Sequence, residues 1–180
     1  MKSVLISIQP KWCELIANGT KTVEVRKTFP KVDAPFKVYI YCTHSKSGNA
    51  FCKGNDILNG KVIGEFVCNE IYWLIQAMSG IVIADMDWCV IDPDWFREAS
   101  CLTDEEICNY LKDNDGYGWL ISDLVIYDKP KELSEFHTRK KCDSCKSGYE
   151  STACIYDEKC RVPSPITRPP QSWCYVERRC

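Results

Sequence analysis

The chain has 180 residues, of which 45% are hydrophobic and 12% aromatic, and 23 Lys and Arg stand against 25 Asp and Glu. This length fits one domain, and the apolar content excludes a chain that is disordered throughout. Because no stretch approaches ~18 consecutive apolar residues, a membrane-spanning helix is also excluded. Residues 1–10 alternate too regularly for a signal peptide, so we expect a soluble cytoplasmic protein without a membrane partner.

Charge is distributed unevenly along the chain, although the net charge is only −2. Residues 1–61 carry 10 Lys and Arg and 4 Asp and Glu, residues 62–136 carry 4 and 16, and residues 137–180 carry 9 and 5. Basic ends of this kind suggest polyanion binding through a local patch. A solvated surface with uneven charge is the alternative that composition alone favours.

The N-terminal residues predict a strand followed by a helix. Residues 3–8 are rich in branched apolar side chains and are typical of a buried strand. Pro10 suits the first turn of a helix, because its missing N–H has no partner there. We expect this helix to run over 11–17 and to end near Gly19, where a left-handed residue is favoured.

The rest of the chain predicts several short strands and a second helix. Residues 76–101 have no clean period and are interpreted as irregular or partly helical, and Gly64 indicates a bulge or a close backbone approach. This pattern predicts an α+β, mainly β fold, with a small β-barrel and flanking helices. The expected strands are 36–42, 61–72, 119–127 and 172–177. The expected helix is 104–112, and it opens on a capping box.

A first candidate site follows the helix. Valine alternates with polar residues from Thr22 onward, so Glu24 and Arg26 share one face of a strand and can pair, with Lys21 at its start. Two cations and a carboxylate at a glycine turn can hold a phosphate and read a donor group on a base. From spacing alone, a surface strand with neighbouring charges is the simpler interpretation.

The spacing Gly19-x-Lys21-x-x-Glu24-x-Arg26 resembles the motif of ASCH domains, which belong to the PUA-like superfamily. The resemblance covers most of 1–136 and 166–178, and its elements occur in the family order. The other segments that carry it are Val38-Tyr39-Ile40-Tyr41, Val62-Ile63-Gly64-Glu65-Phe66, Leu102-Thr103-Asp104-Glu105-Glu106, Gly116-Tyr117-Gly118-Trp119 and Arg168-Pro169-Pro170-Gln171-Ser172-Trp173-Cys174-Tyr175-Val176.

The resemblance implies a PUA-like small β-barrel with a cleft that the motif residues line. ASCH domains are regarded as RNA-binding modules, so we expect an RNA- or nucleotide-binding protein in a regulatory role. Lys21 and Arg26 would contact phosphate, and Glu24 would orient them or accept from a base edge. Tyr117, which lies between two glycines, would stack on the base, and His44 is a further cleft candidate.

A hydrolase is the first alternative, because one ASCH branch hydrolyses N4-acetylcytidine. That branch has a threonine three residues after the motif lysine, where this chain has Glu24. Lys21, Glu24 and Glu65 could still support acid–base chemistry on a modified nucleoside or on RNA, with a raised pKa for Glu65 in apolar surroundings. A structural ion pair is the other interpretation, and the sequence favours it over catalysis.

A protein-interaction module is the second alternative. The stretch 76–106 is acidic, and it would dock a basic partner through charge complementarity.

The chain is interpreted as a single domain, 1–180, with a cysteine-rich insertion at 137–165. In the cytoplasm, 13 cysteines favour reduced thiols or metal ligands over disulfides. Two thiolates in the pattern Cys-x-x-Cys have the spacing of half a structural zinc site, whereas reduced thiols in a mobile loop are equally compatible with it. The candidate zinc ligands are Cys142, Cys145, Cys154 and Cys160, with His137 as a substitute.

Overall fold

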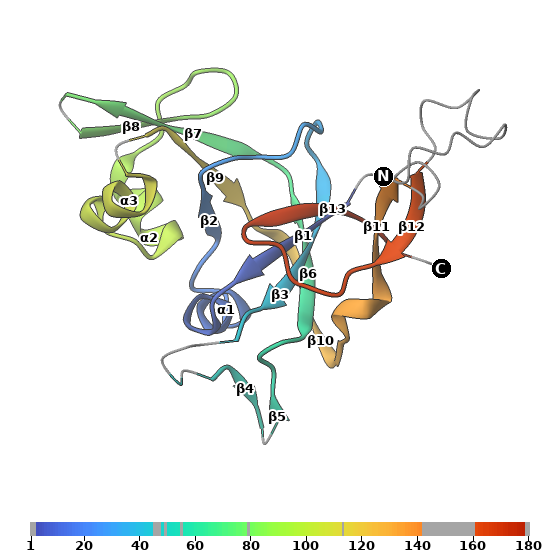
Figure 1. Ribbon diagram of the computed structural model, residues 1–180. Coiled ribbons are helices and arrows are strands. Elements are labelled where there is room, and N and C mark those ends of the chain that lie inside the picture. Colours follow the sequence, from blue (N-terminus) through green and yellow to red (C-terminus); the bar gives the residue numbers. More distant parts are fainter. Residues whose placement is uncertain are drawn as a thin grey trace, which may run out of the picture.

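The computed structural model describes residues 3–44, 48, 50–54, 56–78, 80–112, 114–141 and 161–178. Within these residues the strands form a seven-stranded sheet, a four-stranded sheet and a two-stranded ribbon, together with three α-helices and one 3-10 helix (Figure 1). No helix in these ranges is long and apolar enough to cross a membrane.

The seven-stranded sheet forms the body of the molecule. Only one of its pairs is parallel, that between β1 and β3, and the connection between these two strands carries a helix. On its other side β1 pairs with the C-terminal β13, so the two ends of the chain meet in the middle of the sheet. In spatial order its strands are β10 (Ser122–Lys131), β6 (Val62–Cys68), β3 (Phe36–Cys42), β1 (Ser3–Ile8), β13 (Trp173–Arg178), β11 (Phe136–Lys141) and β12 (Arg161–Pro165).

The four-stranded sheet is antiparallel throughout. Its core-facing residues pack against two of the helices, so that Val23, Leu74, Phe96 and Leu111 belong to one buried cluster. In spatial order its strands are β2 (Val23–Arg26), β9 (Gly116–Leu120), β7 (Ile71–Ala77) and β8 (Gly80–Ala84). The small ribbon pairs β4 (Cys52–Lys53) with β5 (Asp56–Ile57).

The helices begin at local sequence signals, a proline for α1 and side-chain caps for α2 and α3. Helix α1 (Pro10–Ala17) starts at the proline, as predicted, and Gly19 behind it adopts a left-handed φ of 80°. Helix α3 (Asp104–Leu111) opens on the predicted capping box. Helix α2 (Pro93–Ser100) follows an Asp92 cap and packs on β2 and β8 (Figure 1). The 3-10 helix η1 (Leu133–Glu135) precedes β11.

Two of the predicted strands are each two strands in the structure. The run 61–72 divides into β6 and β7, and the run 119–127 divides into β9 and β10. Both runs leave one sheet and enter the other, and the N–H of Leu120 donates to the carbonyl oxygen of Glu70 (3.1 Å) at the point where both cross. Each run is apolar on both sides of the bend, so periodicity gives no sign of the change of sheet.

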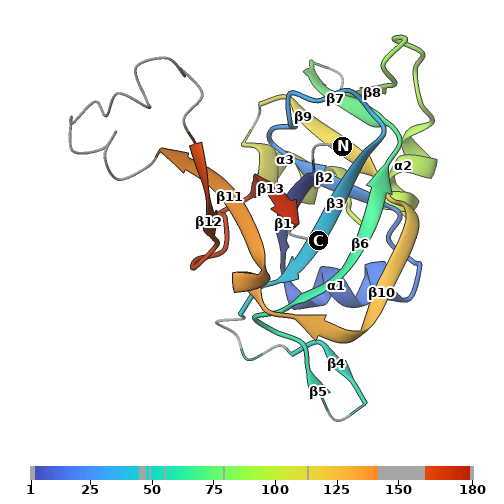
Figure 2. The same cartoon turned by 90° about the vertical axis from the view of Figure 1, so that its right-hand side faces the viewer.

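The α+β, mainly β class is confirmed, whereas the predicted closed barrel is not seen. The two larger sheets are open, and no strand pairing in the described ranges joins their edges. The sheets are connected by the covalent crossings from β6 to β7 and from β9 to β10, and a closed barrel would also need hydrogen bonds between edge strands. Figure 2 shows β3, β6 and β10 side by side as the curved wall of the body.

The predicted insertion begins and ends in paired strands. Strands β11 and β12 form an antiparallel ladder from the pair His137 and Pro165 to the pair Lys141 and Arg161. The four candidate zinc ligands, Cys142, Cys145, Cys154 and Cys160, lie outside the described residues. In the described part of the chain, no group of three or more His, Cys, Asp or Glu side chains is arranged to hold a metal ion.

The glycine in β6 lies where two strands approach closely. A Cβ on Gly64 would come within 2.4 Å of the carbonyl oxygen of Val125 in β10, and the ladder with β3 shifts register at the same place. This agrees with the bulge or close approach that the sequence indicates.

We therefore expect Gly64→Ala to destabilise the fold by about 1–3 kcal/mol, because the clash is with backbone and cannot be relieved by a rotamer. Urea unfolding measures this cost. Gly116→Ala is the matched control, because the three atoms nearest to its Cβ all belong to the side chain of Leu111 and not to backbone. Equal costs for the two variants would contradict this assignment.

Candidate functional site

The candidate site is built where the chain turns from α1 into β2. After the left-handed Gly19, the N–H of Lys21 donates to the carbonyl oxygen of Leu15 (2.9 Å), and the N–H of Thr22 donates to that of Ala99 (2.8 Å). The first bond holds the turn against α1, and the second holds it against α2. Strand β2 is therefore fixed between the two helices at the point where its charged side chains begin.

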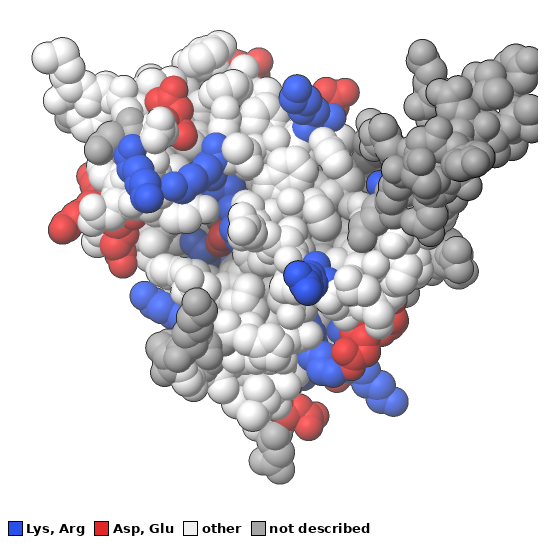
Figure 3. All heavy atoms as spheres, in the orientation of Figure 1, with Lys and Arg blue, Asp and Glu red and all other residues white. Residues whose placement is uncertain are grey.

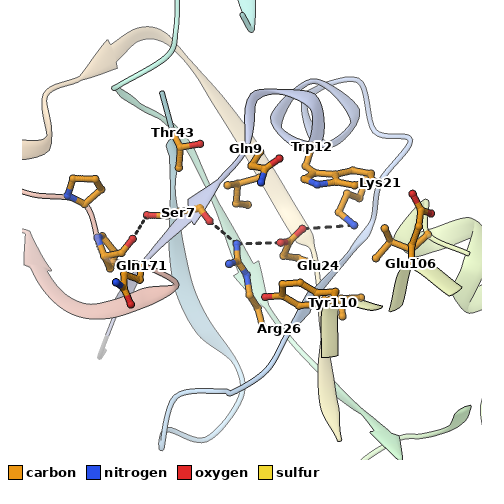
Figure 4. Close-up of a pocket in the computed structure, with 15 residues that line it drawn as sticks. Ser7, Gln9, Trp12, Lys21, Glu24, Arg26, Thr43, Glu106, Tyr110 and Gln171 are labelled. Carbon is orange, nitrogen blue, oxygen red and sulfur yellow. Dashed lines mark hydrogen bonds and ion pairs between the residues drawn. The ribbon is translucent and has the colours of Figure 1, made fainter. Parts of the chain in front are cut away.

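The three charged motif residues converge, as the sequence predicts for Glu24 and Arg26. The Glu24 carboxylate lies between the two cations, with one oxygen 3.1 Å from the Arg26 guanidinium and the other 3.6 Å from the Lys21 ammonium. Figure 4 shows the three side chains in one row, with the carboxylate in the centre. The row is an ion triad within a single turn and strand.

Backbone carbonyls complete the triad at both ends. The Lys21 ammonium donates to the carbonyl oxygen of Ser100 at the end of α2 (2.5 Å), and the Arg26 guanidinium donates to that of Ser7 in β1 (2.6 Å). The three motif residues are only 2%, 6% and 7% exposed. Buried charges are tolerated when they are paired and hydrogen-bonded, so the triad links α2, β2 and β1.

Two polar atoms of the triad are left without a hydrogen bond in the described part of the chain. They are the Oε2 atom of Glu24, an acceptor, and the Nε atom of Arg26, a donor, and both are buried. Buried polar groups are nearly always satisfied by protein or ordered water. The triad thus has one acceptor and one donor that a ligand or an ordered water would satisfy.

The triad lies at a pocket of about 620 Å³, a size common among small-molecule sites. Main-chain and side-chain groups from the ends of β1, β2, β3, α1 and α3 meet there, together with the segment before β13. Its lining residues are Ser7, Ile8, Gln9, Trp12, Lys21, Glu24, Val25, Arg26, Thr43, Leu102, Glu106, Tyr110, Pro169, Pro170 and Gln171.

Two aromatic residues flank the triad. In Figure 4 Trp12 of α1 lies on one side of the row of charges and Tyr110 of α3 on the other. Outside them, the exposed Lys11 ammonium lies 4.3 Å from the centre of the Trp12 ring, and the exposed Lys27 ammonium lies 5.3 Å from that of Tyr110. Figure 3 shows this hollow with basic and acidic atoms inside it and further basic side chains around it.

The charges that line the pocket balance. Two cations, Lys21 and Arg26, face two carboxylates, Glu24 and Glu106. Hydrogen bonds from Thr103 hold the pKa of Glu106 below its ordinary value, with a smaller contribution from nearby lysines, so this carboxyl group is charged at neutral pH. The interior is therefore polar without a strong net charge.

Tyr117 and His44 do not line the pocket. The Tyr117 ring packs against Phe29 at 4.6 Å and Trp73 at 5.1 Å between ring centres, on β9. The imidazole of His44 lies against Gly60, and its neighbour Thr43 lines the pocket instead. The pocket aromatics are Trp12 and Tyr110.

Glu65 lies on β6, outside the pocket lining, and does not join Lys21. Its carboxylate accepts from the Lys37 ammonium (2.6 Å) and from the Tyr127 hydroxyl (2.5 Å). Partial burial raises the pKa of Glu65, but these two hydrogen bonds outweigh it and the net shift is downward. The expected raised pKa was wrong, because the sequence shows apolar neighbours on the same face but not a partner on the adjacent strand.

Sequence reasoning missed the residues of the pocket wall. Glu106 and Tyr110 stand four apart on one face of α3, a spacing that puts side chains on a common face. The spacing does not show which other element of the fold that face contacts. Leu102 precedes the helix. Gln171 belongs to the closing segment that resembles the family, yet nothing in its spacing marks it as a wall residue.

We expect Glu24→Ala to destabilise the protein by about 3–5 kcal/mol, because it leaves the buried Lys21 and Arg26 without a counter-charge. Chemical denaturation measures the loss. Glu14→Ala on the exposed face of α1 is the control and should be nearly neutral. A Glu24 variant as stable as the control would show that the triad is not a structural element.

No protein-family model matches the sequence, and no curated protein matches it. The fold does match solved structures. The ASCH protein of Zymomonas mobilis has a TM-score of 0.57 and 19% identity, over 98% of this chain and 88% of that chain. Two mutant forms of it have the same TM-score and 18% identity, over 91% and 89% of their own chains. At this identity the likeness establishes the fold, and this chain has the ASCH fold that its motif predicts.

Proposed function

We propose that the pocket binds one nucleotide of an RNA, with the base inside and the phosphates at the rim. The observation that carries this proposal is that two triad atoms between the two aromatic rings, Glu24 Oε2 and Arg26 Nε, have no hydrogen bond among the described residues. The resemblance to ASCH domains, which are regarded as RNA-binding modules, supports the same class of ligand. We infer that such an RNA-binding protein has a regulatory role.

The hydrogen-bonding capacities of Glu24 Oε2 and Arg26 Nε suit the edge of a base. A carboxylate oxygen only accepts and a guanidinium nitrogen only donates. Nucleobases carry a donor beside an acceptor on their pairing edges, and proteins read unstacked RNA bases on those edges. A base that lies between Trp12 and Tyr110 would present such an edge to the triad.

The balanced charge of the interior favours an uncharged base over a phosphate. The Lys21 and Arg26 cations, which the sequence assigns to phosphate, are each paired with Glu24 and bonded to a backbone carbonyl. We therefore assign phosphate contact to Lys11 and Lys27, which are exposed beside the two aromatic residues. Phosphate contacts made by exposed lysines weaken as salt rises.

Binding fits the site better than hydrolysis does. The hydrolase interpretation needs a carboxylate that is free to move a proton beside Lys21. Glu24 is engaged by both cations, and Glu65 is engaged by Lys37 and Tyr127. The third carboxylate, Glu106, accepts from the N–H and the hydroxyl of Thr103. RNA binding is thus the function that we propose for this geometry.

Replacing Tyr110, the more exposed of the two pocket aromatic residues, tests the proposal. We expect Tyr110→Ala to weaken binding of a short single-stranded RNA by about 1–3 kcal/mol, because stacking on one base is lost. Fluorescence anisotropy with a labelled oligonucleotide measures the affinity. Tyr175→Ala is the matched control, because both tyrosines are 40% exposed and Tyr175 does not line the pocket.

Two results would contradict the proposal. One is a Tyr110→Ala protein that binds the RNA as tightly as the Tyr175→Ala protein does. The other is turnover of N4-acetylcytidine or of labelled RNA that Lys21→Ala abolishes, which would make the site that of a hydrolase.

A further inference from the structure

A second surface of the molecule exposes apolar side chains over a short stretch of chain. Of the ten large hydrophobic residues that are exposed in the described ranges, six lie between residues 78 and 95. The hairpin of β7 and β8, from Ile71 to Ala84, contains no charged residue at all. Figure 1 shows this hairpin extending away from the body of the protein. Clusters of this kind on a soluble domain mark interaction sites.

Apolar side chains share one face of the hairpin. Ile75 stands opposite Val82, and Trp73 stands opposite Ala84, so residues of the same parity point to the same side. Trp88, which is 65% exposed, stacks on Trp73 with 5.7 Å between ring centres. We call this surface the tryptophan face, and it comprises Trp73, Ile75, Val82, Met86 and Trp88.

The loop after β8 holds Trp88 in its exposed position. The Asp85 carboxylate accepts from the N–H groups of Asp87 (2.9 Å) and Cys89 (2.8 Å), and Trp88 itself donates to the Asp85 carbonyl oxygen. Trp88 has a left-handed φ of 64°, which a bulky residue rarely adopts. Such backbone strain persists where the surroundings enforce it, and it is common at functional positions.

Beside the tryptophan face, β8 is an edge strand. Its outer side is covered only at one end, where Ile91 donates to the carbonyl oxygen of Ile83 and Val90 pairs with Ala84. Toward Gly80, no strand pairs with that side among the described residues. Neither a lysine nor a proline protects the strand, although edge strands normally carry such residues. An open edge of this kind accepts an added strand.

The charge around this surface is acidic. Residues 62–96 contain six Asp and Glu and no Lys or Arg. Asp87, which precedes Trp88 in the chain, and Asp92, which precedes α2, are both exposed. Nucleic acid and anionic lipid would be repelled, and a second copy of the same surface would bring like charges together.

We propose that the tryptophan face and the open edge of β8 form a docking surface for a protein partner that presents an extended, arginine- or lysine-bearing segment. The segment adds to β8 as a strand, and its apolar side chains cover Val82 and Ile75. Its cations lie over the exposed Trp88 ring and beside Asp87, which combines cation–π attraction with charge pairing. This surface is independent of the pocket.

The test uses the full chain and two labelled synthetic peptides, one that alternates valine with arginine and one that alternates valine with glutamate. In fluorescence anisotropy the arginine peptide binds and the glutamate peptide does not. Trp88→Ala and Asp87→Lys each weaken binding by about tenfold or more, as expected for anchor residues of an interface. Hydrogen exchange at the amides of β8 slows when the arginine peptide is bound.

Two matched variants separate docking from general charge attraction. Asp33→Lys changes the net charge as Asp87→Lys does, at an exposed position on another loop, and Val125→Ser removes an exposed strand valine from the other sheet. Both bind the peptide like the unaltered protein. The proposal is overturned if the arginine peptide fails to bind, if the controls lose as much affinity as the test variants, or if Trp88→Ala instead disperses a dimer or abolishes RNA binding.

Discussion

The burial of Glu24 between Lys21 and Arg26 is the constraint on which the site depends. Charges this far from water are stable only when each has a partner, and the partners here come from the end of α2, from β1 and from β2 itself. The same contacts that satisfy the charges therefore fix three elements relative to one another. The pocket lies beside them, and Lys21, Glu24 and Arg26 all line it.

The proposed contacts with RNA differ between the interior of the pocket and its rim. The interior, where positive and negative charges balance, suits an uncharged base. Trp12 and Tyr110 suit the two faces of that base, and Lys11 and Lys27 outside them suit phosphate. The tryptophan face belongs to the same four-stranded sheet, because Arg26 stands opposite Tyr117 and Tyr117 stands opposite Trp73 across the strands. In these two proposals one sheet contributes to both the RNA pocket and the protein-docking surface. Tyr117, which was expected in the pocket, packs against Trp73 of the tryptophan face instead.

The sequence predicts what local chemistry controls and misses what depends on long-range packing. Pro10, Gly19 and the capping box mark helix ends correctly, because caps are local. The motif predicts the pairing of Glu24 with Arg26, because alternation puts both on one face. The division of 61–72 and 119–127 into strands of different sheets is invisible, since apolar residues occupy both sides of each bend. Trp12 and Tyr110 are missed for the same kind of reason, because helix spacing does not specify which neighbour a face meets.

The most direct measurement follows the Nε–H signal of Arg26 by NMR in isotope-labelled protein, identified by its absence in Arg26→Lys. This donor is buried and has no hydrogen bond within the described ranges, so it is expected to bond to the base. Adding an uncharged nucleoside, cytidine or adenosine, should shift the signal, whereas inorganic phosphate should leave it in place. An RNA that binds the protein while the Arg26 signal stays unchanged would contradict the account.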